Sequence, residues 1–444
     1  MSQKTVRFGV CGNVDSGKST ISGILAKLPD GVYDDGRGYA RSLMFAHKHE
    51  HQTGRTSSIT RESKVLGNII HEFVDLAGHE MYLKTTVNGL CGHNIDYILL
   101  IVAANVGLSK MTKEHLRLSA SLRYPIIIVV TKIDLTPPNI LLETMNSIKR
   151  YIKDVKAFSH HIKSDKDFES NILKQFLTEK FERFLPIFCV SNKTGEGIDL
   201  LKKFLYLTDP VQKFDSQAIP VFNIHMSYCP PGIGLVVSGI IQSGSIHKGD
   251  KLELGPIQRL KQFVSVKVWS IHDDFRNTID RAEAGMTCSL AIKILDKNLK
   301  NMIDRDDIRR GCKIVKEPRL IKSFLAQVYI FGNKTTTIIE GYEPVLSCMT
   351  SVQVAKIIKV FPNDQDDIKF DNNQIQQKDQ PKSTNGKKED FDSKIKSSCV
   401  LRVGERGNCV FEFKYTPEYL DVGNLFIFRE GMTKGIGKIK NIYE

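Results

Sequence analysis

Residues 6 to 20 of this 444-residue chain read Val6-Arg7-Phe8-Gly9-Val10-Cys11-Gly12-Asn13-Val14-Asp15-Ser16-Gly17-Lys18-Ser19-Thr20. The apolar residues Val6, Phe8 and Val10 predict a buried strand, and apolar residues recur at helical spacing from Ile21 to Leu28. Between them lies the spacing G-x-x-x-x-G-K-S. This order of strand, glycine-rich loop and helix predicts a phosphate-binding loop, because backbone N–H groups and the positive end of the helix converge on one anion.

Each residue type in this loop has a physical task. Gly12 and Gly17 permit backbone conformations and a close approach that a Cβ would block. We expect Lys18 to bridge β- and γ-phosphate oxygens and the Ser19 hydroxyl to ligate Mg²⁺. The alternative is a glycine turn before an ordinary helix, and the later motifs argue against it. The predicted phosphate-binding residues of the loop are Gly12, Asn13, Val14, Asp15, Ser16, Gly17, Lys18, Ser19 and Thr20.

Length and composition place the chain among multi-domain globular proteins. Domains of roughly 100–200 residues suggest two to four of them, and we predict three. Lys and Arg outnumber Asp and Glu by 63 to 50, which favours a polyanionic partner such as RNA, although a solvated surface is often basic too. Nine cysteines without a C-x-x-C pair predict reduced core residues. The chain enters its first strand directly and has no apolar run of roughly 18 residues, so we expect a cytoplasmic protein without membrane contact.

A polar segment, residues 31–59, follows the first helix and contains His47-Lys48-His49-Glu50-His51 and Gly54-Arg55-Thr56-Ser57-Ser58. Alternating histidines could bind a metal from one face of a strand, but no matching Cys or His cluster follows. We therefore expect a switch loop, in which a hydroxyl reaches Mg²⁺ only while the γ-phosphate is present. Thr56 is the leading candidate, and Thr60 and the serines are alternatives.

The run 69–76 predicts a second strand that ends in Asp75-Leu76-Ala77-Gly78-His79-Glu80. At the strand end, Asp75 is expected to hold the hydration shell of Mg²⁺, and the Gly78 N–H to contact the γ-phosphate. Phosphoryl transfer to water depends mainly on positioning. His79 is therefore predicted to orient the attacking water, the alternative being an ordinary surface histidine.

The apolar runs 97–103 and 125–130 predict buried parallel strands with a helix at 113–121 between them. The second run ends in Thr131-Lys132-Ile133-Asp134, which resembles the guanine-reading N-K-x-D motif. The Asp134 carboxylate would accept hydrogen bonds from guanine N1–H and from the 2-amino group of guanine, and adenine offers neither donor. Thr131 stands where Asn is usual and cannot make the same amide contacts. The tripeptide 191–193 follows a strand at 186–190 and would offer a backbone N–H to guanine O6. The predicted guanine-binding residues are Thr131, Lys132, Asp134, Ser191, Asn192 and Lys193.

Amphipathic helical stretches are predicted at 140–152 and 168–184, and the pattern changes after about residue 208. Short β-type runs with glycine turns then predict a small barrel, and the blocks 320–360 and 398–439 predict a second. We expect a disordered low-complexity insertion at about 363–397. The predicted fold is an α/β P-loop GTPase domain (1–211), with a mostly parallel sheet and helices on both faces, followed by two small antiparallel β-barrels (218–317 and 318–444).

The four motifs in this order, followed by two barrels, resemble a translational GTPase of the elongation factor Tu and one-alpha class. Within that class, the segments 47–58 and 75–86 are most similar to the GTP-binding protein 1 and 2 group. The resemblance implies GTP or GDP and Mg²⁺ as ligands, with Thr56 on the metal. It also implies that Val14 is half of an apolar gate and that Asp15 is a candidate ligand of a second cation. Arg55 stands where the factors carry isoleucine, and Asn13 where they usually have histidine, so the trigger for hydrolysis is expected to differ.

The resemblance further implies a monomeric switch that binds aminoacyl-tRNA or another RNA at the ribosome and hydrolyses GTP slowly without a partner. Three alternatives remain. The chain could be an RNA surveillance or decay adaptor controlled by its nucleotide, the GTPase subunit of a sulfate-activating enzyme, or a nucleotide-binding scaffold with weak hydrolysis.

Overall fold

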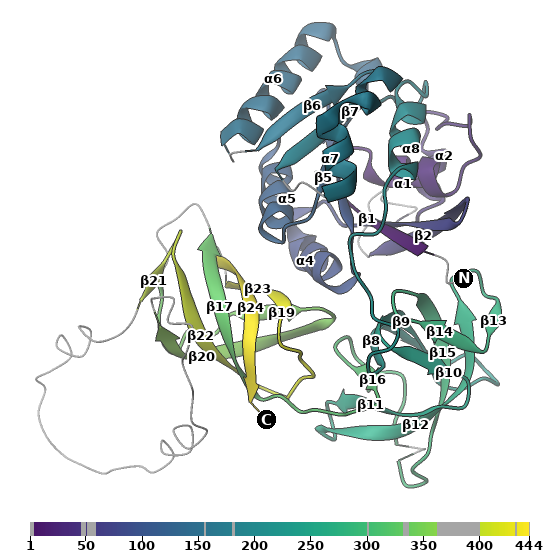
Figure 1. Cartoon of the computed structure of the whole chain (residues 1–444), viewed down its shortest axis with the longest axis vertical. Helices are drawn as coiled ribbons and strands as arrows, with labels where there is room; N and C mark the ends of the chain where they lie inside the picture. The colour runs from purple at the N-terminus through teal and green to yellow at the C-terminus, as the bar shows by residue number, and fades with distance from the viewer. Residues whose placement is uncertain are drawn as a thin grey trace, which may run out of the picture.

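The computed structural model describes residues 4–45, 50, 59–154, 157–179, 183–299, 302–331, 337–361, 400–430 and 433–443. An α/β part, at the top of Figure 1, contacts two β-barrels below it. We call these the N-terminal domain (β1 to α8), the first barrel (β8 to β16) and the second barrel (β17 to β24). This arrangement confirms the predicted fold class. Thr56, Arg55 and the predicted insertion at 363–397 lie outside the described residues.

A seven-stranded sheet of order β2-β3-β1-β4-β5-β7-β6 forms the centre of the N-terminal domain. All neighbouring strands are parallel except β2 and β3. The strands are β1 (Lys4–Gly12), β2 (Thr60–Leu66), β3 (Ile69–Asp75), β4 (Tyr97–Ala103), β5 (Ile126–Thr131), β6 (Phe158–Ile162) and β7 (Phe184–Cys189). The helices are α1 (Lys18–Ala26), α2 (Tyr39–Ser42), α4 (Leu83–Gly92), α5 (Lys110–Ser121), α6 (Pro138–Asp154), α7 (Asn171–Glu179) and α8 (Ile198–Tyr206), with short 3-10 turns η1 (Glu80–Tyr82), η2 (Ile133–Leu135) and η3 (Asp165–Glu169).

Helices cover both faces of this sheet. Successive side chains of a strand point to opposite faces, so Leu99 and Ile101 of β4 pack with α1, α7 and α8. Leu100 and Val102 of the same strand pack with α4, α5 and α6. Burial on both faces explains why the central strands read as uninterrupted apolar runs.

Each barrel closes around its own apolar core. The first has the order β11-β16-β8-β9-β15-β12, closed by pairing of β11 with β12, and β13 extends β12. The second is the closed barrel β17-β22-β20-β19-β23-β24. The first barrel contains β8 (Val221–Tyr228), β9 (Val236–Ser243), β10 (Ser245–His247), β11 (Lys251–Ile257), β12 (Gln262–Asp273), β13 (Thr278–Ile279), β14 (Arg281–Glu283), β15 (Thr287–Ile294) and β16 (Lys313–Val315). The second contains β17 (Ser323–Phe331), β18 (Thr337–Ile338), β19 (Val345–Cys348), β20 (Ser351–Phe361), β21 (Leu401–Arg402), β22 (Arg406–Phe413), β23 (Leu425–Glu430) and β24 (Thr433–Tyr443).

The N-terminal domain holds the first barrel through a buried arginine. Arg7 of β1 is fully buried, and its Nε lies 2.9 Å from Glu72 Oε2. Its Nη2 donates to the Gly285 carbonyl oxygen at 2.6 Å and to Thr287 Oγ1 at 3.1 Å, both in the first barrel. Arg61 also binds Glu72, at 3.2 Å. Burial raises the pKa of the Glu72 carboxyl, but the two arginines outweigh it, so the net shift is downward and the carboxylate stays charged.

Helix α4 connects the N-terminal domain to the second barrel. It packs against β19 and β23, and Ile427 of β23 lies in the same apolar cluster as Leu90 of α4. Ser347 donates to Asn88 Oδ1 at 3.1 Å across this interface. In Figure 1, α4 is the helix of the upper part that lies above β23 and β19.

Two buried histidines meet where the first barrel contacts the N-terminal domain. The rings of His93 and His225 have centroids 4.1 Å apart, and His225 Nε2 lies 2.9 Å from the Gly92 carbonyl oxygen. Burial lowers the pKa of His225 to about 3, and nearby Arg61 adds to this. Burial and His225 also lower the pKa of His93 well below its usual range. Both rings are therefore neutral in the folded protein.

We expect acid to weaken the folded protein through this pair. The unfolded chain takes up protons near the ordinary histidine pKa of about 6.5, whereas the folded chain does not. Above pH 6.5 the pair therefore does not lower the free energy of unfolding. As the pH drops from 6.5 toward 3, the free energy of unfolding falls by about 1.4 kcal/mol per pH unit for each proton that only the unfolded chain binds. Urea unfolding midpoints between pH 7.5 and 5 should fall less steeply in His225→Gln than in the wild type. His247→Gln, on an exposed histidine of the first barrel, is the control. If the urea midpoint changes with pH equally steeply in His225→Gln and in the wild type, buried neutral His225 does not cause the loss of stability in acid.

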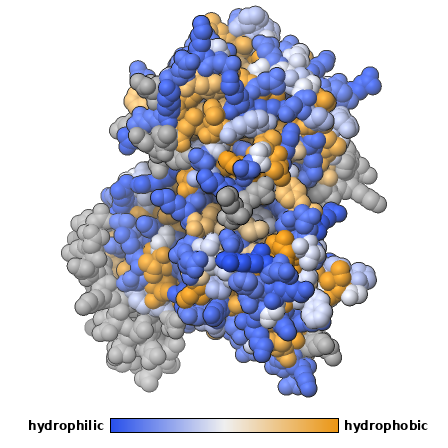
Figure 2. All heavy atoms as spheres, turned by 45° about the vertical axis from the view of Figure 1, so that its right-hand side comes forward, coloured by the Kyte–Doolittle hydropathy of each residue, from blue (hydrophilic) through white to orange (hydrophobic). Residues whose placement is uncertain are grey.

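Within the described ranges, no helix combines the length and the apolar character needed to cross a membrane. The face drawn in Figure 2 is mostly hydrophilic, with smaller apolar groups between the polar residues.

Candidate functional site

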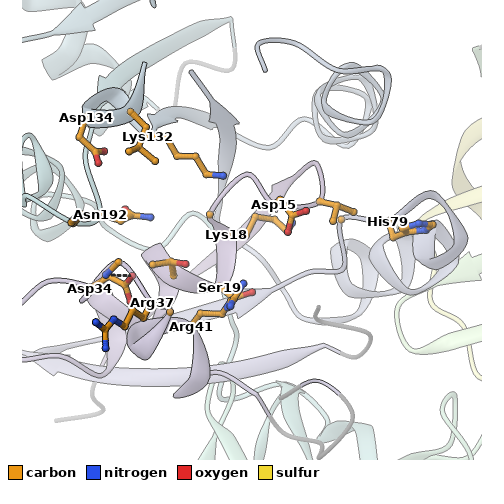
Figure 3. Close-up of a pocket in the computed structure, with 18 of the residues that line it drawn as sticks. Asp15, Lys18, Ser19, Asp34, Arg37, Arg41, His79, Lys132, Asp134 and Asn192 are labelled. Atoms are coloured by element: carbon orange, nitrogen blue, oxygen red, sulfur yellow. Dashed lines mark hydrogen bonds between the residues drawn. The ribbon is translucent and has the colours of Figure 1, made fainter. Parts of the chain in front are cut away.

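A cavity of about 450 Å³ opens at the carboxyl ends of the parallel strands. Its walls come from the loop between β1 and α1, the segment 34–41, the turn 78–82 and the loops that follow β5 and β7 (Figure 3). Of the predicted residues, the cavity brings together Val14, Asp15, Gly17, Lys18, Ser19, Thr20, Gly78, His79, Lys132, Asp134, Asn192 and Lys193. The other predicted residues of the described chain, Gly12, Asn13, Ser16, Asp75, Thr131 and Ser191, do not line it.

The loop between β1 and α1 wraps around the Lys18 ammonium. Gly17 precedes α1 with φ of +89°, a conformation that favours glycine. Lys18 Nζ donates to the Asn13 carbonyl oxygen at 2.8 Å, and Ser16 Oγ donates to the same oxygen at 2.8 Å. A Cβ at Gly78 would lie 2.7 Å from the Gly12 carbonyl oxygen and 2.9 Å from the Asn13 carbonyl carbon, so glycine is required where the second motif approaches the backbone of the loop. Burial lowers the pKa of Lys18, and the Asp75 carboxylate opposes that shift. The loop is thus shaped to receive phosphate oxygens beside one cation.

Two oxygen ligands suited to Mg²⁺ meet beside Lys18. Ser19 Oγ donates to Asp75 Oδ2 at 2.6 Å, and Asp75 is fully buried at the end of β3. Mg²⁺ prefers oxygen ligands and takes few from the protein when phosphates and water supply the rest. Across the described part of the chain, no group of three or more His, Cys, Asp and Glu residues could hold a metal by itself. The donor set therefore fits a cation bound together with a nucleotide.

On the opposite side of the cavity, Ser191 orients Asp134. Ser191 is fully buried, and its hydroxyl donates to Asp134 Oδ1 at 2.7 Å while accepting from the Thr194 N–H at 3.1 Å. The carboxylate is thereby fixed in the cavity with Oδ2 left for a ligand that carries N–H donors. Asn192 also points into the cavity in Figure 3. This arrangement suits the guanine edge that offers N1–H and the 2-amino group.

Thr131 has a different position from the one expected for a base-binding residue. It is fully buried behind the cavity, and its hydroxyl donates to the Ser16 carbonyl oxygen at 2.6 Å. The hydroxyl of Thr131 thus supports the phosphate loop, whereas Asp134 lines the cavity.

His79 lies at the edge of the cavity rather than over the phosphate loop. Its Nδ1 accepts from the Met81 N–H at 3.1 Å, which caps η1. In Figure 3 the ring points away from Lys18. Since Nδ1 is the acceptor, a neutral ring carries its proton on Nε2. Orienting a water at the γ-phosphate requires the ring to turn and to give up this capping bond.

Sequence reasoning missed two parts of the site. His115 of α5 is buried, and its Nδ1 accepts from the Gly12 N–H at 3.1 Å, which fixes the start of the phosphate loop. The only signal was its place on the buried face of an amphipathic helix. The second part is the wall at 34–41, which carries Arg37 and Arg41 and belongs to the segment 31–59, which was predicted as a switch loop without any role for these two arginines.

Together, the fold and site define a P-loop nucleotide-binding domain of the translation-factor type joined to two β-barrels. Residues 3–226 match the family of the elongation factor Tu GTP binding domain, and the chain belongs to this family. GTP-binding protein 1 of Xenopus laevis is 34% identical over 99% of the chain, and human GTP-binding protein 2 is 32% identical over 98%. The crystal structure of translation elongation factor SelB from Methanococcus maripaludis with the GTP analogue GppNHp superposes over 100% of the chain and 80% of SelB, with a TM-score of 0.65 at 20% identity. At that identity the likeness concerns the fold.

The relatives extend beyond the part that this chain matches. The chain spans 64% of the Xenopus laevis protein and 69% of the human one.

Proposed function

We propose that this protein binds GTP and GDP with Mg²⁺ and hydrolyses GTP as a translation-factor-like switch. The observation that carries the proposal is the pairing of two sites in one cavity: Ser19 with Asp75 beside Lys18, and Asp134 held by Ser191. The first fits a metal-bound triphosphate, and the second fits guanine. Thr56 is the proposed third protein ligand of Mg²⁺, and His79 the residue that orients water.

The nucleotide site is connected to both barrels, which supports the role of a switch. Gly78, His79 and η1 lead directly into α4, and α4 packs on the second barrel. The strand that enters the phosphate loop carries Arg7, which binds the first barrel. A change at the γ-phosphate would therefore alter contacts with two separate modules.

An exposed face of the first barrel supports an RNA partner. Lys251, Lys267 and Lys293 lie directly opposite one another on the neighbouring strands β11, β12 and β15. Like charges opposite one another destabilise a sheet, so such a row favours a bound polyanion. Trp269 is 53% exposed beside them, with Lys293 Nζ 3.4 Å from its ring centroid. An exposed indole among lysines can stack on a nucleic-acid base.

The name of the solved relative, a translation elongation factor, points to the translation machinery. We therefore propose aminoacyl-tRNA at the ribosome as the RNA partner, with a cytoplasmic monomer as the active form. Hydrolysis is slow until the ribosome places His79, because its ring is engaged in capping η1.

The proposed RNA face can be tested with labelled aminoacyl-tRNA and the full chain loaded with GppNHp. We expect Trp269→Ala to weaken binding about 5- to 100-fold, since a stacked base contributes roughly 1–3 kcal/mol. Lys267→Glu should weaken binding and flatten its salt dependence. Lys153→Glu, at the end of α6, is the charge-matched control. Unchanged affinity in both barrel variants would remove this face from the proposal.

Ribosome-stimulated GTP hydrolysis separates the remaining functions. A translation switch hydrolyses GTP faster with ribosomes, whereas a surveillance adaptor or a scaffold does not. A sulfate-activation subunit instead requires sulfate adenylylation stimulated by GTP.

A further inference from the structure

The segment from Asp34 to Arg41 forms one wall of the nucleotide cavity. The Asp34 N–H donates to the Asn192 carbonyl oxygen at 2.9 Å, which ties the segment to the base side. The Asp34 carboxylate accepts from the N–H groups of Gly36 at 3.0 Å and Ala40 at 2.8 Å. At the other end, Ala40 belongs to α2, and a Cβ on Gly23 of α1 would clash with the Ala40 carbonyl oxygen. The backbones of α1 and α2 are therefore in direct contact. The segment is therefore fixed at both ends.

This wall places two arginines at the cavity, and their environments differ. Arg37 is exposed and lies beside Asp34 in Figure 3, whereas Arg41 reaches toward Ser19. The Nε of Arg41 is buried and has no hydrogen-bond partner among the residues that the structure describes. A buried, unpaired guanidinium N–H is costly, and a phosphate oxygen would satisfy it.

Glycine beside this arginine leaves room for the guanidinium. A Cβ at Gly38 would lie 2.9 Å from Arg41 Nη2, and Gly38 itself has φ of +98°. The ring of Phe45 lies under the guanidinium, with its centroid 5.9 Å from Cζ. The side chain is thus supported on one side by an aromatic ring and faces the cavity on the other.

We propose that Arg41 is a further nucleotide-binding residue, whose guanidinium pairs with the phosphates that are not transferred. The proposal rests on the proposed binding of GTP and GDP. Arg41 belongs to α2, which packs on α1 beside Ser19 and Thr20. Gly78, the proposed contact of the γ-phosphate, approaches Lys18 rather than Arg41. Arg41 therefore strengthens the binding of diphosphate and triphosphate alike, and it holds the nucleotide after hydrolysis.

The test is titration calorimetry of the nucleotide-free full chain with GDP and with GppNHp. A charge-assisted bond to a phosphate predicts roughly 10- to 100-fold weaker binding of both nucleotides to Arg41→Ala. Arg41→Lys should recover part of the loss, because it keeps the charge without the forked geometry. Arg41→Gln preserves more of the packing over Phe45, so we expect it to disturb folding less than Arg41→Ala does. Circular dichroism checks that both variants are folded. Arg183→Ala, on an exposed arginine before β7, is the control and should bind as the wild type does.

Two results would overturn the assignment. Unchanged affinity for both nucleotides in folded Arg41→Ala and Arg41→Gln would show that the guanidinium does not contact phosphate. A loss confined to GppNHp would place it on the γ-phosphate instead. A wild-type protein that binds neither nucleotide would refute the proposed function itself, which keeps the two failures distinct.

Discussion

Asp134→Asn is expected to exchange guanine for xanthine as the preferred base. Ser191 donates to Asp134 Oδ1, and an asparagine held by the same hydroxyl would keep its oxygen there and turn its amide N–H₂ toward the base. That group repels the 2-amino group of guanine but donates to the 2-oxo group of xanthine. Two bonds to a charged acceptor are lost, so GDP affinity should fall about 100-fold or more, and XDP should become the tighter ligand.

Calorimetry with GDP and XDP measures this exchange. Asp154→Asn, at the exposed end of α6, removes the same charge outside the cavity and should leave the preference for GDP unaltered. An Asp134→Asn protein that retains wild-type affinity for GDP would mean that another group reads the base.

His79→Ala is expected to abolish stimulated hydrolysis while leaving nucleotide affinity within about threefold. The imidazole lies at the cavity edge and contributes little to the bound ground state, so its loss should appear in the chemical step. Positioned proton-transfer and water-orienting groups typically contribute about 10²- to 10⁴-fold, which sets the expected size of the defect.

Single-turnover hydrolysis of GTP with and without ribosomes measures that defect. His160→Ala, an exposed histidine on β6, is the matched control. If His79→Ala responds to ribosomes as the wild type does, the histidine has no role in positioning the water.

Much of the fold was predictable because its core obeys simple periodicity. The central strands β4 and β5 are buried on both faces, and their uninterrupted apolar sequences predicted them. The phosphate loop, Asp75 and Asp134 were predictable because each motif requires particular residue types at the end of a strand. The barrels followed from short β-type runs separated by glycine turns.

The edges of the sheet were not predictable in the same way. Strand β2, Thr-Arg-Glu-Ser-Lys-Val-Leu, is polar and half-buried, and β6 contains two histidines, so neither shows an apolar pattern. Within the predicted helix at 168–184, the described residues form the end of η3, which stops at Glu169, then α7, and β7 already begins at Phe184. The proposed role of Arg41 could not be predicted from the sequence, because it depends on contact between α2 and α1 rather than on a motif. The base contact of Thr131 stays a prediction; the structure shows its hydroxyl on the Ser16 carbonyl oxygen, an orientation that sequence alone does not reveal.

Arg7 and Gly12 lie five positions apart on β1. The strand that leads into the phosphate loop is therefore also hydrogen-bonded to the first barrel. Two binding events that are coupled through one strand obey thermodynamic reciprocity. Under the proposed function, any factor by which guanine nucleotide changes the affinity of the first barrel for RNA is also the factor by which RNA changes the affinity for the nucleotide. Under the proposed function, nucleotide loading and RNA binding are therefore coupled through β1.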